Sequence, residues 1–487
     1  MPVENPDLTH LWNQTRSEFQ RLWGYADFRP PQGEIVRSLL GQRDTLIVLP
    51  TGAGKSICFQ LPAVLQTGLT LVISPLVALM ENQVEELQQR QLAAAQFHSE
   101  CSAQQRRQTL RAIEQQRLRL LYLSPESLFH LEIWQRLCHP DLKINGLIID
   151  EAHCLVHWGE TFRPAYRRLG AVRPALLKSK PPGSKMAIAA FTATADLPTQ
   201  QVIQTVLQLQ QPQTFRLSPY RPNLDLQVQI IWTPKGRRQT LHQLIQAQAH
   251  STGLVYTRTR RDSEALAAWL QAQGFRTTAY HAGLSPQERR QIETAWLKGT
   301  ISFVICTCAF GMGINKSDVR WVCHFHPPLT LSEYVQEMGR AGRDGQRSRV
   351  LMLVSEPTGW LDPEDQQRRR FFTDQLRSQQ QAAAQLAEKL PVQGEINRVT
   401  RQFKEGAVAL ALLHSTGRLI WRDPFHYVIR QSSVTQPLTQ LNTLAIQQMV
   451  DYIRIKGCRW QFLLQAFGST AEAESFQCGH CNNCRKR

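Results

Sequence analysis

Short apolar runs, separated by longer amphipathic stretches, dominate two regions of the chain, about 25–205 and about 215–355. Each run is rich in Ile, Val and Leu and is almost unbroken in apolarity. Strands buried on both faces of a parallel sheet have this composition, because helices cover both faces. The pattern predicts an α/β fold with two parallel-sheet lobes. The predicted strands are 45–49, 70–74, 120–123, 147–150 and 186–191 in the first lobe, and 253–256, 277–280, 303–306, 321–324 and 349–354 in the second.

The pattern changes after residue 360. Residues 362–390 are rich in Gln, Arg and Ala and predict a helix, whereas 400–430 predict a helix followed by a hairpin. Residues 441–487 predict a helix that leads into a cluster of cysteines. The expected domains are a first lobe, a second lobe, a helical linker and a C-terminal subdomain, at 1–208, 209–360, 361–440 and 441–487.

Composition supports a globular protein that binds a polyanion. The 487 residues suggest about three folding units, and 42% apolar with 20% charged residues excludes a wholly disordered chain. Lys plus Arg number 56 against 39 Asp plus Glu, a formal charge of +17, so nucleic acid is the first candidate partner. A solvated basic surface is the alternative. The N-terminus has no signal-peptide pattern, and no apolar run is long enough for a membrane helix, so we expect a cytoplasmic protein without a membrane partner.

Residues 45–56 read TLIVLPTGAGKS, a buried strand feeding a glycine-rich turn that opens a helix. Backbone N–H groups in such a turn approach phosphate oxygens closely, and the helix N-terminus favours their charge. Lys55 would hold the β- and γ-phosphates, and Ser56 would ligate Mg²⁺. Leu49 occupies the position where the full pattern has glycine, so a chance Gly-Lys-Ser turn is the alternative. The candidate nucleotide-binding residues of the turn are Thr51, Gly52, Gly54, Lys55 and Ser56.

Two further segments supply the groups that phosphoryl transfer needs. Residues 147–153 read LIIDEAH, so Asp150 could hold Mg²⁺ and Glu151 could polarise the attacking water. The alternative is an acidic helix cap. In QEMGRAGRDG, Arg340 and Arg343 lie three residues apart, and on one helix face both guanidiniums could point into a cleft between the lobes. A basic surface helix with a glycine kink is the alternative here.

Four of the eleven cysteines form a C-terminal cluster with the spacing C-x19-C-x2-C-x2-C. Four thiolates at such spacing suit a closed tetrahedral zinc site of structural role. Disulfides and an iron–sulfur cluster are the alternatives. His480 lies inside the cluster and is interpreted as a bystander, because four sulfurs complete the shell. The candidate ligands are Cys458, Cys478, Cys481 and Cys484.

Taken together, these motifs resemble those of the RecQ family of DNA helicases, superfamily-two enzymes with a DEAH-type box. The segments that carry the resemblance occur in the family's order. They are LWGYADFRPPQ, TGAGKS, VISPLVALMENQV, YLSPESL, DEAHCLVHWGETFRP, FTATAD, YHAGL, CAFGMGINK and QEMGRAGRDG, together with the KGCRWQFLLQAFG segment that opens the cysteine cluster.

The resemblance implies two tandem RecA-like lobes, a helical zinc-binding subdomain and further site residues. Arg29 and Gln32 in FRPPQ would contact the adenine base, although Pro31 replaces the usual glycine. Thr192 and Thr194 would couple nucleotide state to lobe movement. Ser74 and Ser124 would contact the DNA backbone, and Trp158, Phe162 and Arg163 of the aromatic-rich loop would sense single-stranded DNA.

Many relatives continue beyond the cysteines into a winged-helix domain, whereas three residues follow Cys484 here. We therefore expect no winged-helix domain after the cysteines, and the candidate for such an element lies before them. A helix at 407–414 precedes two predicted strands, 419–421 and 425–429. This is the plan of a winged-helix-like insertion, with a plain α/β packing element as the alternative. The candidate DNA-facing side chains of this wing are Trp421 and His426.

The expected function is that of an ATP-dependent DNA helicase that uses ATP, Mg²⁺ and Zn²⁺. The resemblance implies 3′ to 5′ movement on single-stranded DNA, action on forked DNA in recombination and repair, association with the nucleoid in a bacterium, and a single-strand-binding protein as a candidate partner. An RNA helicase or remodeller, and a non-unwinding DNA-binding or annealing ATPase, are the alternatives. The aromatic-rich loop and the terminal thiols favour DNA.

Overall fold

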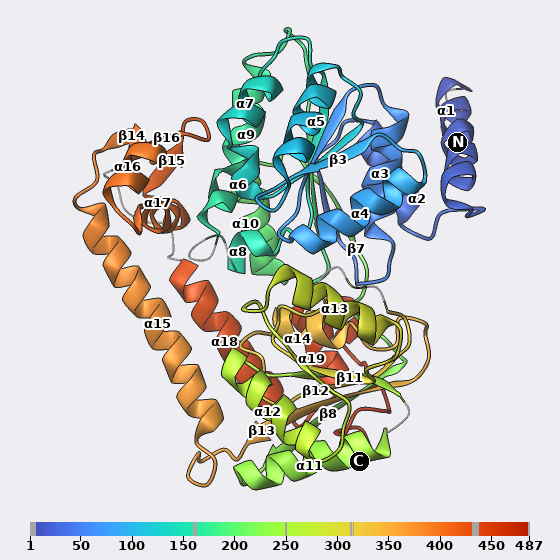
Figure 1. The fold of residues 1–487 in the computed structure, drawn as a ribbon, viewed down its shortest axis with the longest axis vertical. Coiled ribbons are helices and arrows are strands. Elements are labelled where there is room, and N and C mark those ends of the chain that lie inside the picture. Colours follow the sequence, from blue (N-terminus) through green and yellow to red (C-terminus); the bar gives the residue numbers. More distant parts are fainter. Residues whose placement is uncertain are drawn as a thin grey trace. The chain divides into compact units, whose positions relative to one another are not determined.

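The computed structural model describes residues 6–157, 159, 163–248, 251–311, 314, 316–430 and 438–485. They form two compact units, each described here by itself (Figure 1). Unit 1 comprises residues 1–217 and 380–437, and unit 2 comprises 218–379 and 438–487. Within the described residues, no helix combines the length and the apolarity that crossing a bilayer requires.

Unit 1 is built on a seven-stranded parallel sheet with the order β3-β4-β2-β5-β6-β1-β7. Its strands are β1 (Thr45–Val48), β2 (Leu69–Ile73), β3 (Ala94–Phe97), β4 (Leu120–Leu123), β5 (Ile144–Ile149), β6 (Ala187–Thr192) and β7 (Gln213–Arg216). Its helices are α1 (Pro6–Trp23), α2 (Gln32–Leu40), α3 (Lys55–Leu65), α4 (Val77–Gln89), α5 (Ala103–Glu114), α6 (Pro125–Leu128), α7 (Leu131–Leu137), α8 (Cys154–His157), the 3-10 helix η1 (Pro164–Ala171), α9 (Val172–Leu177) and α10 (Leu197–Leu207).

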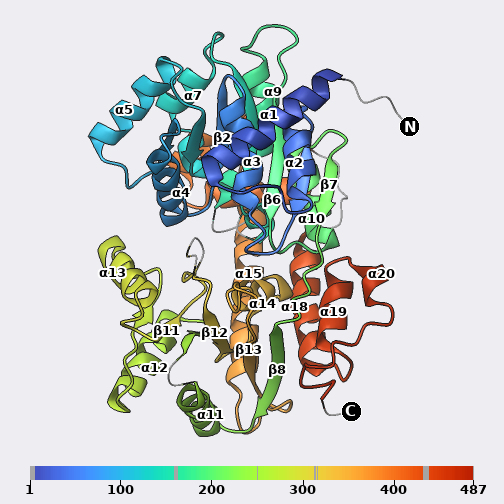
Figure 2. The same ribbon diagram turned by 90° about the vertical axis from the view of Figure 1, so that its right-hand side faces the viewer.

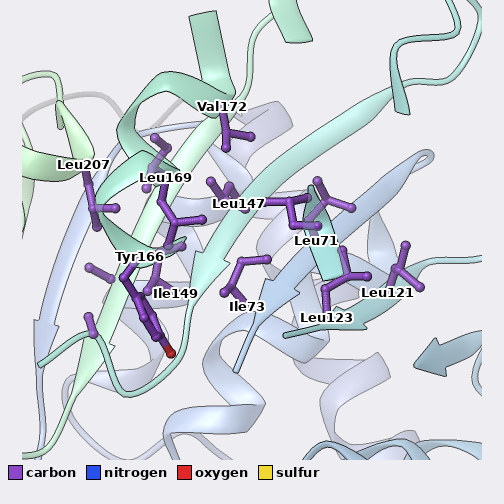
Figure 3. Packing of buried hydrophobic residues seen from close by; sticks show 14 of the residues in the cluster. Leu71, Ile73, Leu121, Leu123, Leu147, Ile149, Tyr166, Leu169, Val172 and Leu207 are labelled. Carbon is purple, nitrogen blue, oxygen red and sulfur yellow. The ribbon is translucent and has the colours of Figure 1, made fainter. Parts of the chain in front are cut away.

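Successive residues of the central strands bury their side chains on opposite faces of this sheet. On one face, Leu71 and Ile73 of β2 pack with Leu147 and Ile149 of β5 and with Tyr166 of η1 (Figure 3). Side chains from the alternate strand positions form a second cluster on the other face. Burial on both faces explains why these strands are apolar throughout, and it confirms the predicted α/β class.

Unit 2 contains a six-stranded parallel sheet with the order β10-β11-β9-β12-β13-β8. Its strands are β8 (Leu224–Ile231), β9 (Thr252–Tyr256), β10 (Ala279–Tyr280), β11 (Phe303–Cys306), β12 (Val319–His324) and β13 (Ser348–Ser355). Its helices are α11 (Pro234–Ala247), α12 (Arg260–Ala272), α13 (Pro286–Leu297), α14 (Leu331–Met338), α18 (Leu438–Arg454), α19 (Arg459–Ala466) and α20 (Thr470–Ala473), and α15 (Glu364–Ala387) runs from unit 2 into unit 1.

A small module follows α15 and belongs to unit 1. Its three-stranded antiparallel sheet has the order β14-β16-β15, with two helices between the first two strands of the sequence. The order helix, strand, helix, helix, strand, strand, which begins with α15, is that of a winged-helix-like module. The structure thus contains β14 and α16 in addition to the helix and the hairpin that the sequence predicted. The elements are β14 (Gln393–Glu395), α16 (Ile396–Gln402), α17 (Gly406–Ser415), β15 (Leu419–Trp421) and β16 (His426–Ile429).

The two side chains proposed for a DNA-facing wing differ in exposure. Trp421 is buried in the module's own core beside Leu410 and Tyr427, whereas His426 is exposed and lies 3.0 Å from Asp423. The expectation that Trp421 faces DNA is therefore wrong, because its indole packs among the apolar side chains of the module's core.

A buried ion pair fixes the strand that precedes the glycine-rich turn. Asp44, just before β1, accepts hydrogen bonds at 2.7 Å from Arg173 of α9, at 2.8 Å from the backbone N–H of Ile188 and at 2.6 Å from that of Gln210. Both charged side chains are almost wholly buried. A buried charge of this kind is tolerated only while it keeps its partners.

We predict that Asp44→Ala lowers the free energy of unfolding of unit 1 by about 3 kcal/mol or more, because Arg173 is left as an uncompensated buried charge. Urea denaturation followed by circular dichroism measures this. Asp141→Ala is the matched control, since Asp141 is largely exposed and lies on the same unit. Equal midpoints for the two variants would contradict the prediction.

Candidate functional site

The predicted phosphate-handling residues of the first lobe meet at the carboxyl end of the unit 1 sheet, called the carboxyl edge below. Strands β5, β6 and β1 are neighbours in this order, and all three run in the same direction. At their carboxyl ends, β5 is followed by Asp150, β6 ends in Thr192, and β1 is followed by the turn that leads to Lys55. Ligands of open parallel sheets bind outside the carboxyl ends of the strands, so this edge is the candidate nucleotide site.

The glycine-rich turn has the geometry of a phosphate loop. Lys55 is the first residue of α3, and its Nζ donates a hydrogen bond to the backbone oxygen of Leu49 at 3.2 Å. Gly54 has a φ of +72°, and a Cβ atom there would lie 2.4 Å from Gln32 Nε2. A side chain at this position is therefore excluded by both backbone conformation and space. Gly54 is the N-cap of α3 and makes no side-chain cap hydrogen bond to its first turn, an arrangement compatible with anion binding there.

Gln32 joins the predicted base-recognition segment to this turn. Its buried side chain donates to the backbone oxygen of Ala53 at 2.9 Å and accepts the backbone N–H of Arg29 at 3.0 Å. The structure thus places Gln32 against the glycine-rich turn and the backbone of Arg29 against Gln32.

Asp150 and Glu151 follow β5 directly. Burial of Asp150, together with the neighbouring Glu151 carboxylate, raises the pKa of Asp150 to about 7, and the nearby Lys55 opposes this shift. Glu151 has a φ of +49°, a conformation that few residues other than glycine adopt, and its N–H donates to Asp150 Oδ1 at 3.0 Å. This turn places the two carboxylates at separate positions on the same edge.

His153 connects this carboxylate pair to β6. Its Nδ1 lies 3.3 Å from Glu151 Oε2 and 3.1 Å from Thr192 Oγ1. Thr192 Oγ1 also accepts the backbone N–H of Thr194 at 3.2 Å. Of the two predicted coupling threonines, Thr192 therefore contacts His153 directly, and Thr194 bonds to Thr192. Sequence reasoning missed His153, although its position in the LIIDEAH segment was a signal for it.

The donor set at this edge fits a magnesium–nucleotide complex. The Ser56 hydroxyl and the Asp150 carboxylate are hard oxygen ligands of the kind Mg²⁺ prefers, and Lys55 supplies the positive charge for phosphate oxygens. Gln83 of α4 donates to Ser56 Oγ at 3.4 Å, a contact that the sequence did not reveal.

The two arginines of unit 2 lie beyond the end of a helix. Helix α14 ends at Met338, and Arg340 and Arg343 lie in the turn that follows it. The expectation that the two arginines share one helix face is therefore wrong. Arg340 donates to the backbone oxygen of Gly311 and Arg343 to that of Ile314. Gly311 has a φ of +102°, and a Cβ there would lie 2.5 Å from Arg340 Nε, so only glycine allows this approach.

The predicted DNA-contact residues are only partly described. Ser74 follows β2 and Ser124 follows the neighbouring β4, and both are buried. Ser124 caps α6 and donates to Ser127 Oγ at 2.8 Å. Arg163 lies 3.5 Å from Glu126 of α6. Trp158 and Phe162 lie outside the described residues.

The four clustered cysteines of unit 2 converge as predicted. Their Sγ atoms all lie within 4.8 Å of one another, and those of Cys478 and Cys484 are 3.8 Å apart. Four Zn–S bonds of about 2.3 Å in a tetrahedron place sulfurs about 3.8 Å apart, whereas a disulfide needs about 2 Å. His480 lies 3.3 Å from the Tyr220 hydroxyl and is not one of the converging ligands. The geometry of the cluster fits a closed tetrahedral zinc site and excludes disulfides among its cysteines.

The zinc subdomain is anchored to the edge strand of the unit 2 sheet, as the C-terminal helices beside β8 show (Figure 2). The N–H of Asn482, next to Cys481, donates to the backbone oxygen of Leu226 at 3.0 Å, and its side chain bonds to Val228. Trp460 Nε1 donates to the backbone oxygen of Leu224 at 3.3 Å. The zinc loop therefore pairs with β8 in place of a further strand.

Comparisons with known proteins agree with this geometry. Three family models match the chain: DEAD/DEAH box helicase over residues 29–203, helicase conserved C-terminal domain over 236–345, and RecQ zinc-binding over 424–485. The ATP-dependent DNA helicase RecQ of Synechocystis sp. is 49% identical over 466 residues, which cover 96% of this chain and 97% of that protein. RecQ of Bacillus subtilis is 30% identical over 97% of this chain and 67% of that protein.

Other similar proteins are longer or more distant. RecQ of Haemophilus influenzae is 37% identical over 71% of this chain, and the match spans 54% of that relative's length. Among solved structures, the DEAD-box helicase Mss116 bound to single-stranded RNA and AMP-PNP gives a TM-score of 0.58 at 15% identity, covering 72% of this chain and 73% of that one. Saccharomyces cerevisiae Dbp5 bound to RNA and ADP BeF3 gives 0.53 at 14% identity, covering 70% of this chain and 90% of that one. These two likenesses concern the fold.

We predict that Cys481→Ser abolishes stoichiometric zinc and loosens the zinc loop from β8, because three thiolates cannot close the tetrahedral shell. Zinc content by mass spectrometry and hydrogen exchange at 224–228 measure both effects. Cys308→Ser, which changes an exposed cysteine of the same unit, is the control. Full zinc in the Cys481 variant would show that the four cysteines do not hold the ion.

Proposed function

Because the chain belongs to the RecQ family of ATP-dependent DNA helicases, we propose that ATP hydrolysis drives it along single-stranded DNA in the 3′ to 5′ direction and so separates duplex strands. The observation that carries this function is the meeting of the Lys55 turn, Asp150 and Glu151 at the carboxyl edge of the unit 1 sheet.

Each residue at this edge has a distinct proposed role. The α3 N-terminus and Lys55 bind the nucleotide phosphates, with Thr51, Gly52 and Gly54 shaping the turn, and Ser56 and Asp150 hold Mg²⁺. The ion, when bound, would neutralise the phosphate oxygens. Glu151 orients and polarises the attacking water, and its contact with His153 fixes its carboxylate for this purpose. Arg29 and Gln32 recognise the base.

Arg340 and Arg343 are proposed to supply positive charge to the transferring phosphoryl group. Their hydrogen bonds to Gly311 and Ile314 hold both guanidiniums against one backbone segment. A guanidinium that is fixed in advance loses little side-chain entropy when it meets a phosphate.

The nucleic acid proposed for this motor is single-stranded and forked DNA. The formal charge of +17 favours a polyanion, and Ser74, Ser124 and Arg163, with Trp158 and Phe162, are the proposed contacts. We further propose a role in recombination and repair in the cytoplasm, at the nucleoid, with a single-strand-binding protein as a partner.

We predict that single-stranded DNA stimulates ATP hydrolysis, and that Lys55→Ala lowers the stimulated rate by at least about 100-fold because phosphate charge is no longer compensated. Zinc content should stay unchanged, since Lys55 and the cysteines lie in different units. The control is Lys185→Ala, because Lys185 is exposed and precedes β6 at the amino end of the sheet.

The same assay separates the alternative functions. Stimulation by RNA and not by DNA would favour an RNA helicase or remodeller. DNA-stimulated hydrolysis without any strand separation would favour a non-unwinding, annealing ATPase. Wild-type protein without nucleic-acid-dependent hydrolysis would refute a motor altogether.

We predict for the direction of movement that a duplex with a 3′ single-stranded tail is unwound at least about ten times faster than the same duplex with a 5′ tail or blunt ends, since loading requires a strand of the correct polarity. A fluorescence assay of strand release with ATP measures these rates. Equal rates on the two tailed duplexes would contradict 3′ to 5′ movement.

A further inference from the structure

The turn that forms the tip of the winged-helix-like module is packed against the parallel-sheet part of unit 1. The Phe425 ring lies edge-on to Trp134 of α7, with centroids 5.2 Å apart, and to Phe129 at 6.1 Å. Asp423 Oδ1 accepts the N–H groups of Phe425 and His426 at 2.8 and 2.9 Å, which fixes the turn. Phe425 thus joins the core cluster beneath the sheet.

Arg168 of η1 holds the same turn from the other side. Its Nη1 donates to the backbone oxygen of Pro424 at 3.1 Å, and its guanidinium lies 4.1 Å from the centre of the Phe129 ring. Burial lowers the pKa of Arg168 to about 10, so the side chain stays charged at neutral pH. The Pro424 carbonyl, the Phe129 ring and the nearby Glu126 carboxylate all favour this buried charge.

The second helix of the module is also covered. Helix α17 packs along η1, whose Ala171 belongs to the module's core cluster with Leu410 and Leu413. Burial, reinforced by the nearby charge of Arg167, lowers the pKa of His414 to about 3, so this imidazole is neutral and does not repel Arg167. The module and the sheet domain therefore each contribute a side chain to the other's core.

This packing removes the two surfaces that a winged-helix module usually offers to a nucleic acid. A recognition helix must enter a groove of the duplex, yet α17 is largely buried against η1. The aromatic side chain at the wing tip, Phe425, is partly buried and packs edge-on against Phe129 and Trp134, while Arg168 holds the neighbouring Pro424. These surfaces of the module thus contact the parallel-sheet part of unit 1.

The contacted elements, α6 and η1, carry two of the proposed DNA contacts. Phe129 ends α6, whose N-terminal cap is Ser124, and Arg168 lies within η1, which Arg163 caps. The ion pair between Arg163 and Glu126 joins the two elements. The module contacts both elements: Phe425 packs on Phe129 at the end of α6, and Pro424 accepts a hydrogen bond from Arg168 of η1.

We propose that the winged-helix-like module is an internal brace which sets the position of α6 against η1, and that Phe425 and Arg168 are positioning residues for the DNA contacts of Ser124 and Arg163. This inference rests on the proposed function, and it assigns the module no direct part in separating strands.

The test is Phe425→Ala in the full-length, zinc-loaded protein. We expect the DNA concentration for half-maximal stimulation of ATP hydrolysis to rise about tenfold, because two aromatic contacts are lost. The rate at saturating DNA should stay within about twofold, since excess DNA compensates for weaker binding. Phe425→Trp should restore the half-maximal concentration. Phe371→Ala, which truncates an exposed phenylalanine, is the matched control.

A DNA-free measurement keeps this inference separate from the proposed function. Hydrogen exchange in α6 and η1 should become faster in Phe425→Ala and in the milder variant Arg168→Lys, while α3 is unchanged. Unchanged exchange, or an unchanged half-maximal DNA concentration in a folded variant, would overturn the brace. So would Arg422→Glu, at an exposed wing position, if it weakened DNA binding more than Phe425→Ala does. A wild-type protein that DNA does not stimulate, with the exchange result intact, would refute the motor and leave the packing role standing.

Discussion

Burial of strands on both faces of a parallel sheet is the constraint on which the site in unit 1 depends. Because β5, β6 and β1 are apolar on both sides, they can lie only in the middle of the sheet, between two layers of helices. Their carboxyl ends are then adjacent, and the polar residues at these ends lie close together at one end of the sheet. Lys55, Asp150 and Thr192 come together for this reason, although long stretches of chain separate them.

Hydrogen bonds hold the candidate nucleotide-binding groups in place at this end of the sheet. Gln32 bonds to the glycine-rich turn and to the backbone of Arg29, and His153 lies between Glu151 and Thr192. The Lys55 side chain bonds to the backbone oxygen of Leu49, whose N–H donates to the backbone oxygen of Thr192 in β6. Preorganisation of this kind lowers the reorganisation that the chemical step requires.

The C-terminal region combines two modes of attachment. The zinc loop attaches to unit 2 by pairing Asn482 with the free edge of β8, while the winged-helix-like module attaches to unit 1 through Phe425, Arg168 and α17. Both attachments cover surfaces that would otherwise expose backbone or apolar groups. The chain thus leaves unit 2 through α15, contributes a module to unit 1, and returns to unit 2 at α18.

The sequence by itself determined the central strands, the glycine-rich turn after β1, the position of Asp150 and Glu151 after β5 and the cluster of four cysteines, because local composition and spacing decide these features. It did not reveal β3, β7 or β8, since edge strands are partly exposed and have no continuous apolar run. Only the tertiary structure decided that α14 ends before Arg340, that Trp421 is a core residue, and that Phe425 packs on α7. These outcomes depend on which surfaces meet in three dimensions. The packing of Phe425 on Trp134, for example, joins residues that lie far apart in the sequence and leaves no periodic trace in the chain.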